Sequence, residues 1–365
     1  MSELAHSAEP LVPPLALAAY IACVAGAGAL ANCSVIAALL KLSKHGKEIH
    51  LSYETKSYSG LLSIIIQLAI ADFILGTSIC PELWSYNIRT WYFGSHGCVI
   101  YKGINVLAST ASSYIVATIA LHTLATVNLE EKNVSRRIKR NEQDEDDEMR
   151  SSRHSLVASS DSSTPPRTMN LDYRLNSTRI PLTQPSLFVW ILSVSLCVPE
   201  FALATTVHLD DGVILCTVVD PDHKLYMYSM FAIFNLFLPT IIMTVAAVLV
   251  IIKIKISKRV TSVIYGCETI ALLKLSLMLI IVYIVLSAPH SIINGYSIYS
   301  TSIKGNETFL HGVTRESNVL ASASVALSGA YLASTLIRPI MCIIMLPSVR
   351  KAFSCRSIND ETEEV

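Results

Sequence analysis

The chain has 365 residues, of which 52% are hydrophobic and only 15% are charged, whereas a soluble domain averages roughly 25% charged residues. Its 28 basic and 28 acidic residues cancel, which argues against a nucleic-acid-binding protein, because such proteins are usually strongly basic. A mean hydropathy of +0.49 argues against an ordinary soluble enzyme. The charges are unevenly distributed, since ten basic and ten acidic residues lie between Asn128 and Ser186.

Seven stretches of the chain are long and nearly free of charge, and Asp72 and Arg338 are the only charged residues within them. A helix needs about 20 apolar residues to cross the bilayer core, and each stretch can supply them. A soluble protein built from such helices would leave them no polar face. We therefore predict an all-α membrane protein, a seven-transmembrane helix bundle. The stretches are Leu11–Leu40, Ser57–Pro81, Gly103–Leu129, Ile180–Pro199, Leu225–Ile252, Leu275–Ile303 and Ser317–Val349.

On the basis of these spans we divide the chain into five segments, two of which hold the transmembrane helices. The loop between the third and fourth spans combines basic, acidic and serine-rich stretches with Pro165-Pro166. Such a segment cannot bury enough apolar area to offset its ordering entropy, so we expect it to be disordered, either as a solvated linker or as a phosphorylated docking segment. The predicted segments are an N-terminal tail at 1–10, helices one to three in 11–127, a cytoplasmic loop at 128–185, helices four to seven in 186–346, and a short amphipathic eighth helix with a tail at 347–365.

The distribution of Lys and Arg predicts the orientation, because cytoplasmic loops are enriched in both. With the N-terminus outside, the inner segments hold 21 of these residues and the outer segments hold five. We therefore expect a multi-pass plasma-membrane protein with an external N-terminus, a cytoplasmic C-terminus and basic loops near lipid headgroups. On this topology Asn306, in the sequon Asn306-Glu-Thr308, is a glycosylation site. Cys355, beside Phe353 on the amphipathic eighth helix, is a palmitoylation candidate.

Two of the nine cysteines are expected at the outer, oxidising face. Cys98 begins the third span, and Cys216 lies between the fourth and fifth. We expect a disulfide between them, and the alternative is two unrelated thiols. The β-prone residues Val213–Val219 around Cys216 predict a short hairpin.

This succession of elements resembles a rhodopsin-like (class A) G-protein-coupled receptor of an atypical, orphan-like kind. The resemblance covers nearly the whole chain outside the inserts, and its specificity lies in the order and spacing of the elements. It implies an extracellular ligand and coupling to a heterotrimeric G protein or arrestin. The elements that carry it are Gly28-Ala-Leu-Ala-Asn32, Leu68-Ala-Ile-Ala-Asp72, Trp91-Tyr-Phe-Gly94 before Cys98, Trp190, and the prolines Pro239, Pro289 and Pro339.

Three motifs of this family are altered here. The Asp-Arg-Tyr of the third helix reads His122-Thr123-Leu124, so the arginine that contacts the G protein is missing. Cys-Trp-x-Pro of the sixth helix reads Leu286-Ser287-Ala288-Pro289, and Asn-Pro-x-x-Tyr of the seventh reads Arg338-Pro339-Ile-Met-Cys-Ile343. These changes keep open an alternative function, a non-signalling heptahelical decoy or scaffold. The candidate conformational and transducer positions are His122, Thr123, Leu124, Ser287, Pro289 and Pro339.

The two charges inside the spans are expected to pair, because an isolated carboxylate in mid-membrane costs several kcal/mol. The resemblance implies that Asp72 and Ser112 stand at the family's sodium site, with Arg338 facing them and Asn32 nearby. We hypothesise that the Arg338 guanidinium replaces sodium and makes a charge-assisted, bidentate contact with Asp72. The alternative is that Arg338 extends toward the inner headgroups.

The resemblance also places a ligand site at the outer ends of the helices. Amine receptors of the family carry Asp where this chain has Asn105, so we do not expect an amine anchor there. A mixed pocket under a β-prone loop is typical of receptors for peptides or small polar molecules. We expect no enzymatic activity, cofactor or metal site, because the sequence lacks the corresponding motifs. The ligand-binding candidates are Glu82, Lys102, Asn105, Glu200, Asn235, His290, Asn294 and Tyr331.

Overall fold

The computed structural model describes residues 10–48, 53–154, 182–208, 212–218, 221–260, 267–303, 318–347 and 349–350. In these ranges seven helices are long and apolar enough to cross a membrane, which confirms the predicted multi-pass bundle. The elements are α1 (Pro14–Glu48), α2 (Tyr53–Ile88), α3 (Gly94–His154), α5 (Thr183–Leu203), β1 (Ala204–His208), β2 (Ile214–Val218), α6 (Pro221–Phe231), η1 (Ala232–Phe237), α7 (Leu238–Val260), α8 (Cys267–Val282), η2 (Tyr283–Ser287), α9 (Ala288–Ile303) and α11 (Asn318–Met345). We call α6, η1 and α7 together helix five, α8, η2 and α9 helix six, and α11 helix seven.

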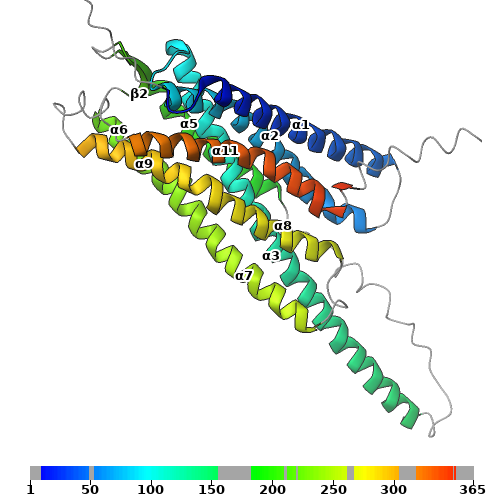
Figure 1. Cartoon of the computed structure of the whole chain (residues 1–365). Coiled ribbons are helices and arrows are strands. Elements are labelled where there is room, and N and C mark those ends of the chain that lie inside the picture. The colour runs from blue at the N-terminus through cyan, green and yellow to red at the C-terminus, as the bar shows by residue number, and fades with distance from the viewer. Residues whose placement is uncertain are drawn as a thin grey trace, which may run out of the picture.

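The helices run side by side, and α3 packs against α2, α5, α7 and α8 (Figure 1). The outward faces carry large apolar side chains, such as Phe188 (60% exposed), Ile241 (59%) and Ile344 (63%). Water would disfavour such faces, whereas lipid tails accept them at no cost. Polar and charged side chains, by contrast, are buried where α2, α3, helix six and helix seven meet.

Helices five and six each contain a widened turn that ends next to a proline. Pro239 has no amide hydrogen and cannot donate to the carbonyl four residues earlier. The amide of Leu238 bonds the Ile233 carbonyl, five residues back, so Ala232–Phe237 forms the π-helical segment η1. Helix six repeats the pattern in η2, because the amide of Ala288 bonds the Tyr283 carbonyl just before Pro289. The predicted bending prolines thus act in these two helices through a π-helical turn.

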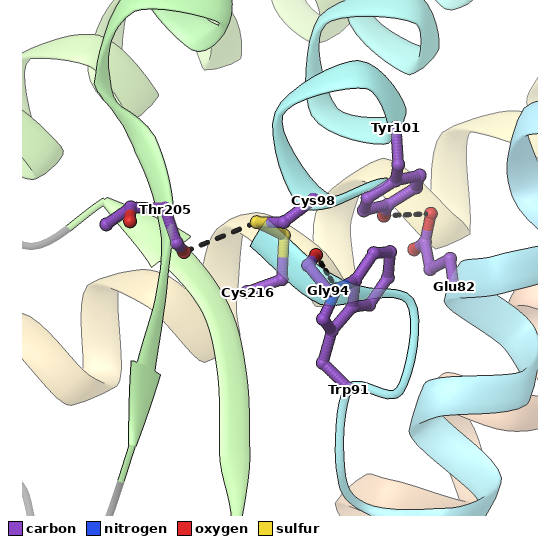
Figure 2. The surroundings of a disulfide bond; sticks show 7 residues. All are labelled: Glu82, Trp91, Gly94, Cys98, Tyr101, Thr205 and Cys216. Atoms are coloured by element: carbon purple, nitrogen blue, oxygen red, sulfur yellow. Dashed lines mark hydrogen bonds between the residues drawn. A yellow bond between two sulfur atoms is a disulfide. The ribbon is translucent and has the colours of Figure 1, made fainter. Parts of the chain in front are cut away.

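One end of the bundle, which we call the disulfide end, is covered by a hairpin. Strands β1 and β2 pair antiparallel, with Ala204 opposite Val218 and His208 opposite Ile214. Cys216 of β2 is bonded to Cys98 near the start of α3, with 5.5 Å between their Cα atoms. Figure 2 shows the Trp91 indole beside this disulfide, and its Nε1 donates to the Gly94 carbonyl at 2.8 Å. The predicted hairpin and disulfide are both confirmed.

At the opposite end the structure differs from the expected disordered loop at 128–185. The third helix continues without a break as α3 to His154, and Figure 1 shows its last part projecting beyond the bundle. The physical reason is local: the first proline of this segment is Pro165, and 128–154 contains no glycine and many Glu, Lys and Arg residues, which favour helix.

Other expectations fall on parts of the chain outside the described residues. These are the serine-rich stretch of the loop after His154, the glycosylation candidate Asn306, and the palmitoylation candidate Cys355 with most of the amphipathic eighth helix.

Candidate functional site

Four helices meet at the side chain of Arg338, which is only 1% exposed. Its Nη1 donates to Asp72 Oδ1 at 2.6 Å and to the hydroxyl of Ser112. Its Nη2 donates to Ser287 Oγ at 2.8 Å. The Ser112 hydroxyl also donates to Asp72 Oδ1, at 2.7 Å. We call these four residues the arginine centre; it joins α2, α3, helix six and helix seven.

The expected contact between Asp72 and Arg338 is therefore present, and Arg338 points into the bundle rather than toward headgroups. The expected bidentate geometry is wrong, because the guanidinium contacts a single carboxylate oxygen. Among the described residues, Asp72 Oδ2 and Arg338 Nε have no hydrogen-bond partner. The guanidinium instead divides its donors between a carboxylate and two hydroxyls, since Ser112 and Ser287 approach it from different helices.

Ser287 is the member of the arginine centre that sequence reasoning did not place there. The sequence marks it as the position where the family's tryptophan is absent. A serine is far smaller than an indole and offers a hydroxyl acceptor, so it accommodates the guanidinium of Arg338. The two residues that differ from the expected motifs on helices six and seven, Ser287 and Arg338, thus contact each other.

Asn32 was expected close to Asp72 and Arg338, but it makes no hydrogen bond to the arginine centre. Its Nδ2 donates to the Gly28 carbonyl at 2.9 Å and to the Thr335 carbonyl at 3.0 Å. Thr335 lies three residues before Arg338 in α11. Asn32 therefore ties α1 to the helix that carries the guanidinium and supports the arginine centre indirectly.

A second buried polar group lies toward the disulfide end, around the carboxylate of Glu82, which is 3% exposed. Glu82 Oε2 accepts from Tyr101 Oη at 2.7 Å and from Asn105 Nδ2 at 3.3 Å. Glu82 Oε1 lies 2.9 Å from His290 Nε2 and accepts from Asn294 Nδ2 at 3.2 Å. We call these five residues the carboxylate cluster. Figure 2 shows the Tyr101 hydroxyl pointing at the Glu82 carboxylate.

The carboxylate cluster contains four of the eight predicted ligand-binding candidates, namely Glu82, Asn105, His290 and Asn294. Tyr331 of helix seven joins it by stacking on His290, with 4.5 Å between the ring centroids. Tyr86 of α2 donates to Asn294 Oδ1 at 3.1 Å. Tyr101 and Tyr86 were missed by sequence reasoning, since a buried tyrosine on an apolar helix carries no sequence signal for its partner.

The remaining candidates lie elsewhere around α3. Lys102 lies near Tyr228 of helix five and within electrostatic reach of Glu200. Glu200, near the end of α5, is 1% exposed, and within the described part of the chain its Oε2 has no hydrogen-bond partner. Asn235 belongs to a different contact, since its Oδ1 accepts from Thr110 of α3 at 2.7 Å.

The widened turn of helix five is held by two tyrosines. Tyr114 of α3 donates to the Phe234 carbonyl at 2.7 Å, and Tyr283 of helix six donates to the Asn235 carbonyl at 3.3 Å. The π-helical hydrogen bonding and Pro239 deprive these two carbonyls of their usual helical donors. The tyrosines replace the missing donors from neighbouring helices.

The altered third-helix motif lies toward the other end of α3. Thr123 is 1% exposed, and its hydroxyl donates to the Ile119 carbonyl of its own helix at 2.7 Å. Leu124 is part of the apolar core, and His122 is half-buried. Thr123 therefore presents no group to a protein docking at this end. For the residues that the structure describes, no group of three or more His, Cys, Asp or Glu could hold a metal ion.

Comparisons with known proteins agree with this architecture. Residues 168–328, somewhat under half of the chain, match the seven-transmembrane receptors of the rhodopsin family. A stretch of 60 residues is 40% identical to dopamine receptor 4 of Caenorhabditis elegans, covering 16% of this chain and 12% of that receptor. The chain thus matches only a small fraction of that relative's length.

Proposed function

We propose that this chain, a seven-transmembrane receptor of the rhodopsin family, is a plasma-membrane receptor that transmits the binding of a small polar ligand to a heterotrimeric G protein. The carboxylate cluster carries this proposal. The disulfide end faces outward and the C-terminus lies in the cytoplasm, as the excess of Lys and Arg in the loops of the opposite end indicates. Receptors of this family are not enzymes.

The carboxylate cluster and its surroundings favour a ligand with hydrogen-bond donors and a positive charge. This region holds the buried carboxylates of Glu82 and Glu200, and Glu200 Oε2 has no hydrogen-bond partner among the described residues. The relative is named for dopamine, which is a protonated amine. Asn105 provides no carboxylate on α3, but α2 supplies one beside it, since Glu82 Oε2 lies 3.3 Å from Asn105 Nδ2.

The effect of ligand binding at the carboxylate cluster would reach the opposite half of the bundle through helix six. A ligand that binds one arrangement of the helices more tightly shifts the population toward that arrangement. Pro289 and the widened turn η2 allow helix six to bend between the carboxylate cluster and the opposite half of the bundle. In the resting state Arg338 takes the place of the family's sodium ion and holds helices two, three, six and seven together.

A non-signalling decoy or scaffold is the competing function, and one observation favours it. Thr123 occupies the place of the arginine that contacts the G protein in the family, and its buried hydroxyl is satisfied within α3. A transducer that needs this arginine would find no substitute there.

The deciding experiment compares the wild type with Thr123→Arg in cells that carry sensors for each class of Gα protein. We expect wild-type activation above an empty-vector control, either basally or with dopamine or tyramine as the probe. An epitope on the N-terminus, stained in intact cells, measures surface expression and should be accessible without permeabilisation. Silence of both variants at normal surface expression would reject signalling in favour of the decoy. An epitope that stains only after permeabilisation, with the protein at the plasma membrane, would reverse the orientation.

A further inference from the structure

One face of helix six carries four polar side chains, at positions 283, 287, 290 and 294. Spacings of three and four residues place side chains on the same side of a helix. The span Ile270–Tyr296, which carries them, is nevertheless the most apolar of the seven, with a mean hydropathy of 2.6. We call Tyr283, Ser287, His290 and Asn294 the polar stripe.

Each member of the polar stripe bonds outside its own helix. Tyr283 reaches the Asn235 carbonyl of helix five, Ser287 accepts from Arg338 of helix seven, and both His290 and Asn294 contact Glu82 of α2. Rotating helix six by one residue position, about 100°, would move the whole stripe away from its partners. Away from water, polar groups left unpaired are costly.

The arginine centre and the carboxylate cluster are built on the same helices. Asp72 and Glu82 both lie on α2, and Ser287 and His290 lie three residues apart on helix six, about 4.5 Å along its axis. Helix seven also spans the two levels, because Tyr331 stacks on His290 and Arg338 follows two turns later. A rigid shift of helix six at one level must therefore be felt at the other.

We propose that the polar stripe is a single cooperative lock, in which opening the contact between Glu82 and His290 also weakens the contact between Ser287 and Arg338. This is how an event at the disulfide end would reach the centre of the bundle. The coupling belongs to the folded chain alone and requires neither a ligand nor a G protein. It can therefore hold or fail separately from the proposed receptor function.

The test is a double-mutant cycle on the purified full chain in lipid nanodiscs, read as the melting temperature. His290→Leu removes the contact to Glu82, and Ser287→Ala removes the acceptor for Arg338. If the lock is cooperative, the double variant loses less than the sum of the two single losses, by about 2 °C or more. Additive losses would overturn the proposal.

A matched control uses another buried serine. Ser193 of α5 is fully buried, and its hydroxyl donates to the Val189 carbonyl of its own helix at 2.8 Å. Ser193→Ala combined with His290→Leu should give additive losses. If the loss in melting temperature of this control pair is smaller than the sum of its single losses by as much as in the test pair, the non-additivity is a general effect of destabilisation. That result would also overturn the proposal.

A conservative variant separates the contact from the packing of the histidine ring. The amide of His290→Gln can still donate to Glu82, so Ser287→Ala should cost as much in that background as in the wild type. If Ser287→Ala lowers the melting temperature as little in the His290→Gln background as in the His290→Leu background, the proposal fails. Should His290→Leu not fold, Asn294→Leu takes its place, because it removes the other contact of helix six to Glu82 Oε1.

Discussion

Arg338 is a charge held where a membrane protein tolerates one only when it is paired. Its partners are a carboxylate on α2 and hydroxyls on α3 and helix six. Removing one partner of a buried ion pair typically costs about 3–5 kcal/mol, because the other charge is left without compensation. At the scale of single residues, this side chain is the one whose substitution should alter the protein most.

Replacing Arg338 by asparagine should create a sodium response that we expect the wild type to lack. Arg338→Asn removes the guanidinium and leaves the Asp72 carboxylate beside the Ser112 hydroxyl, with room for a cation. We expect the melting temperature of this variant to rise when sodium chloride replaces choline chloride at equal ionic strength. The wild type should show no such rise, and an equal sodium response in both proteins would contradict the hypothesis that Arg338 replaces the ion.

At the scale of elements, the widened turn η1 shows how a proline creates contacts between helices. Its freed carbonyls at Phe234 and Asn235 are satisfied by tyrosines from α3 and helix six. The sequence indicates the prolines, but it contains no signal for which tyrosine reaches which carbonyl. Such pairings depend on the rotation of each helix about its axis, which the neighbouring helices determine.

Tyr114→Phe should destabilise the protein by about 1 kcal/mol, read as a lower melting temperature, because it leaves the Phe234 carbonyl without a donor. Tyr20→Phe is the matched control. Tyr20 donates to the Gly329 carbonyl at 2.8 Å, but that carbonyl lies in an uninterrupted stretch of α11 and keeps its helical donor. Equal losses in the two variants would show that the freed carbonyl has no special weight.

The length of α3 was not predicted correctly from the sequence. The charged composition after Asn128 argues against an apolar core there, but it does not argue against a helix. Local propensity and the absence of proline carry the helix on to His154.

At the scale of the whole molecule, the disulfide between Cys98 and Cys216 links α3 to the hairpin across 118 residues of sequence. A disulfide stabilises mainly by restricting the unfolded chain, typically by about 2–4 kcal/mol. The hairpin also packs near the carboxylate cluster, since Trp91 contacts both the Ile214 carbonyl and the Tyr101 ring.

Replacing both cysteines of the disulfide by alanine should lower the melting temperature and increase amide hydrogen exchange in β1 and β2. The control pair is Cys23→Ala with Cys33→Ala, two exposed free cysteines of α1, which should change neither measurement. If the disulfide variant exchanges in the hairpin as slowly as the control, the bond does not hold the hairpin on the bundle.

The sequence by itself determined the seven spans, the disulfide and the pairing of Asp72 with Arg338. The reason is that each follows from one dominant energy: apolar length against bilayer thickness, two cysteines expected at the same face of the membrane, and two opposite charges that cannot stay alone in a membrane. Only the tertiary structure decided that Ser287 completes the arginine centre and that Glu82 and His290, 208 residues apart, share a hydrogen bond. Those contacts depend on how each helix is rotated about its axis and shifted along it. Both are determined by the packing of the whole bundle.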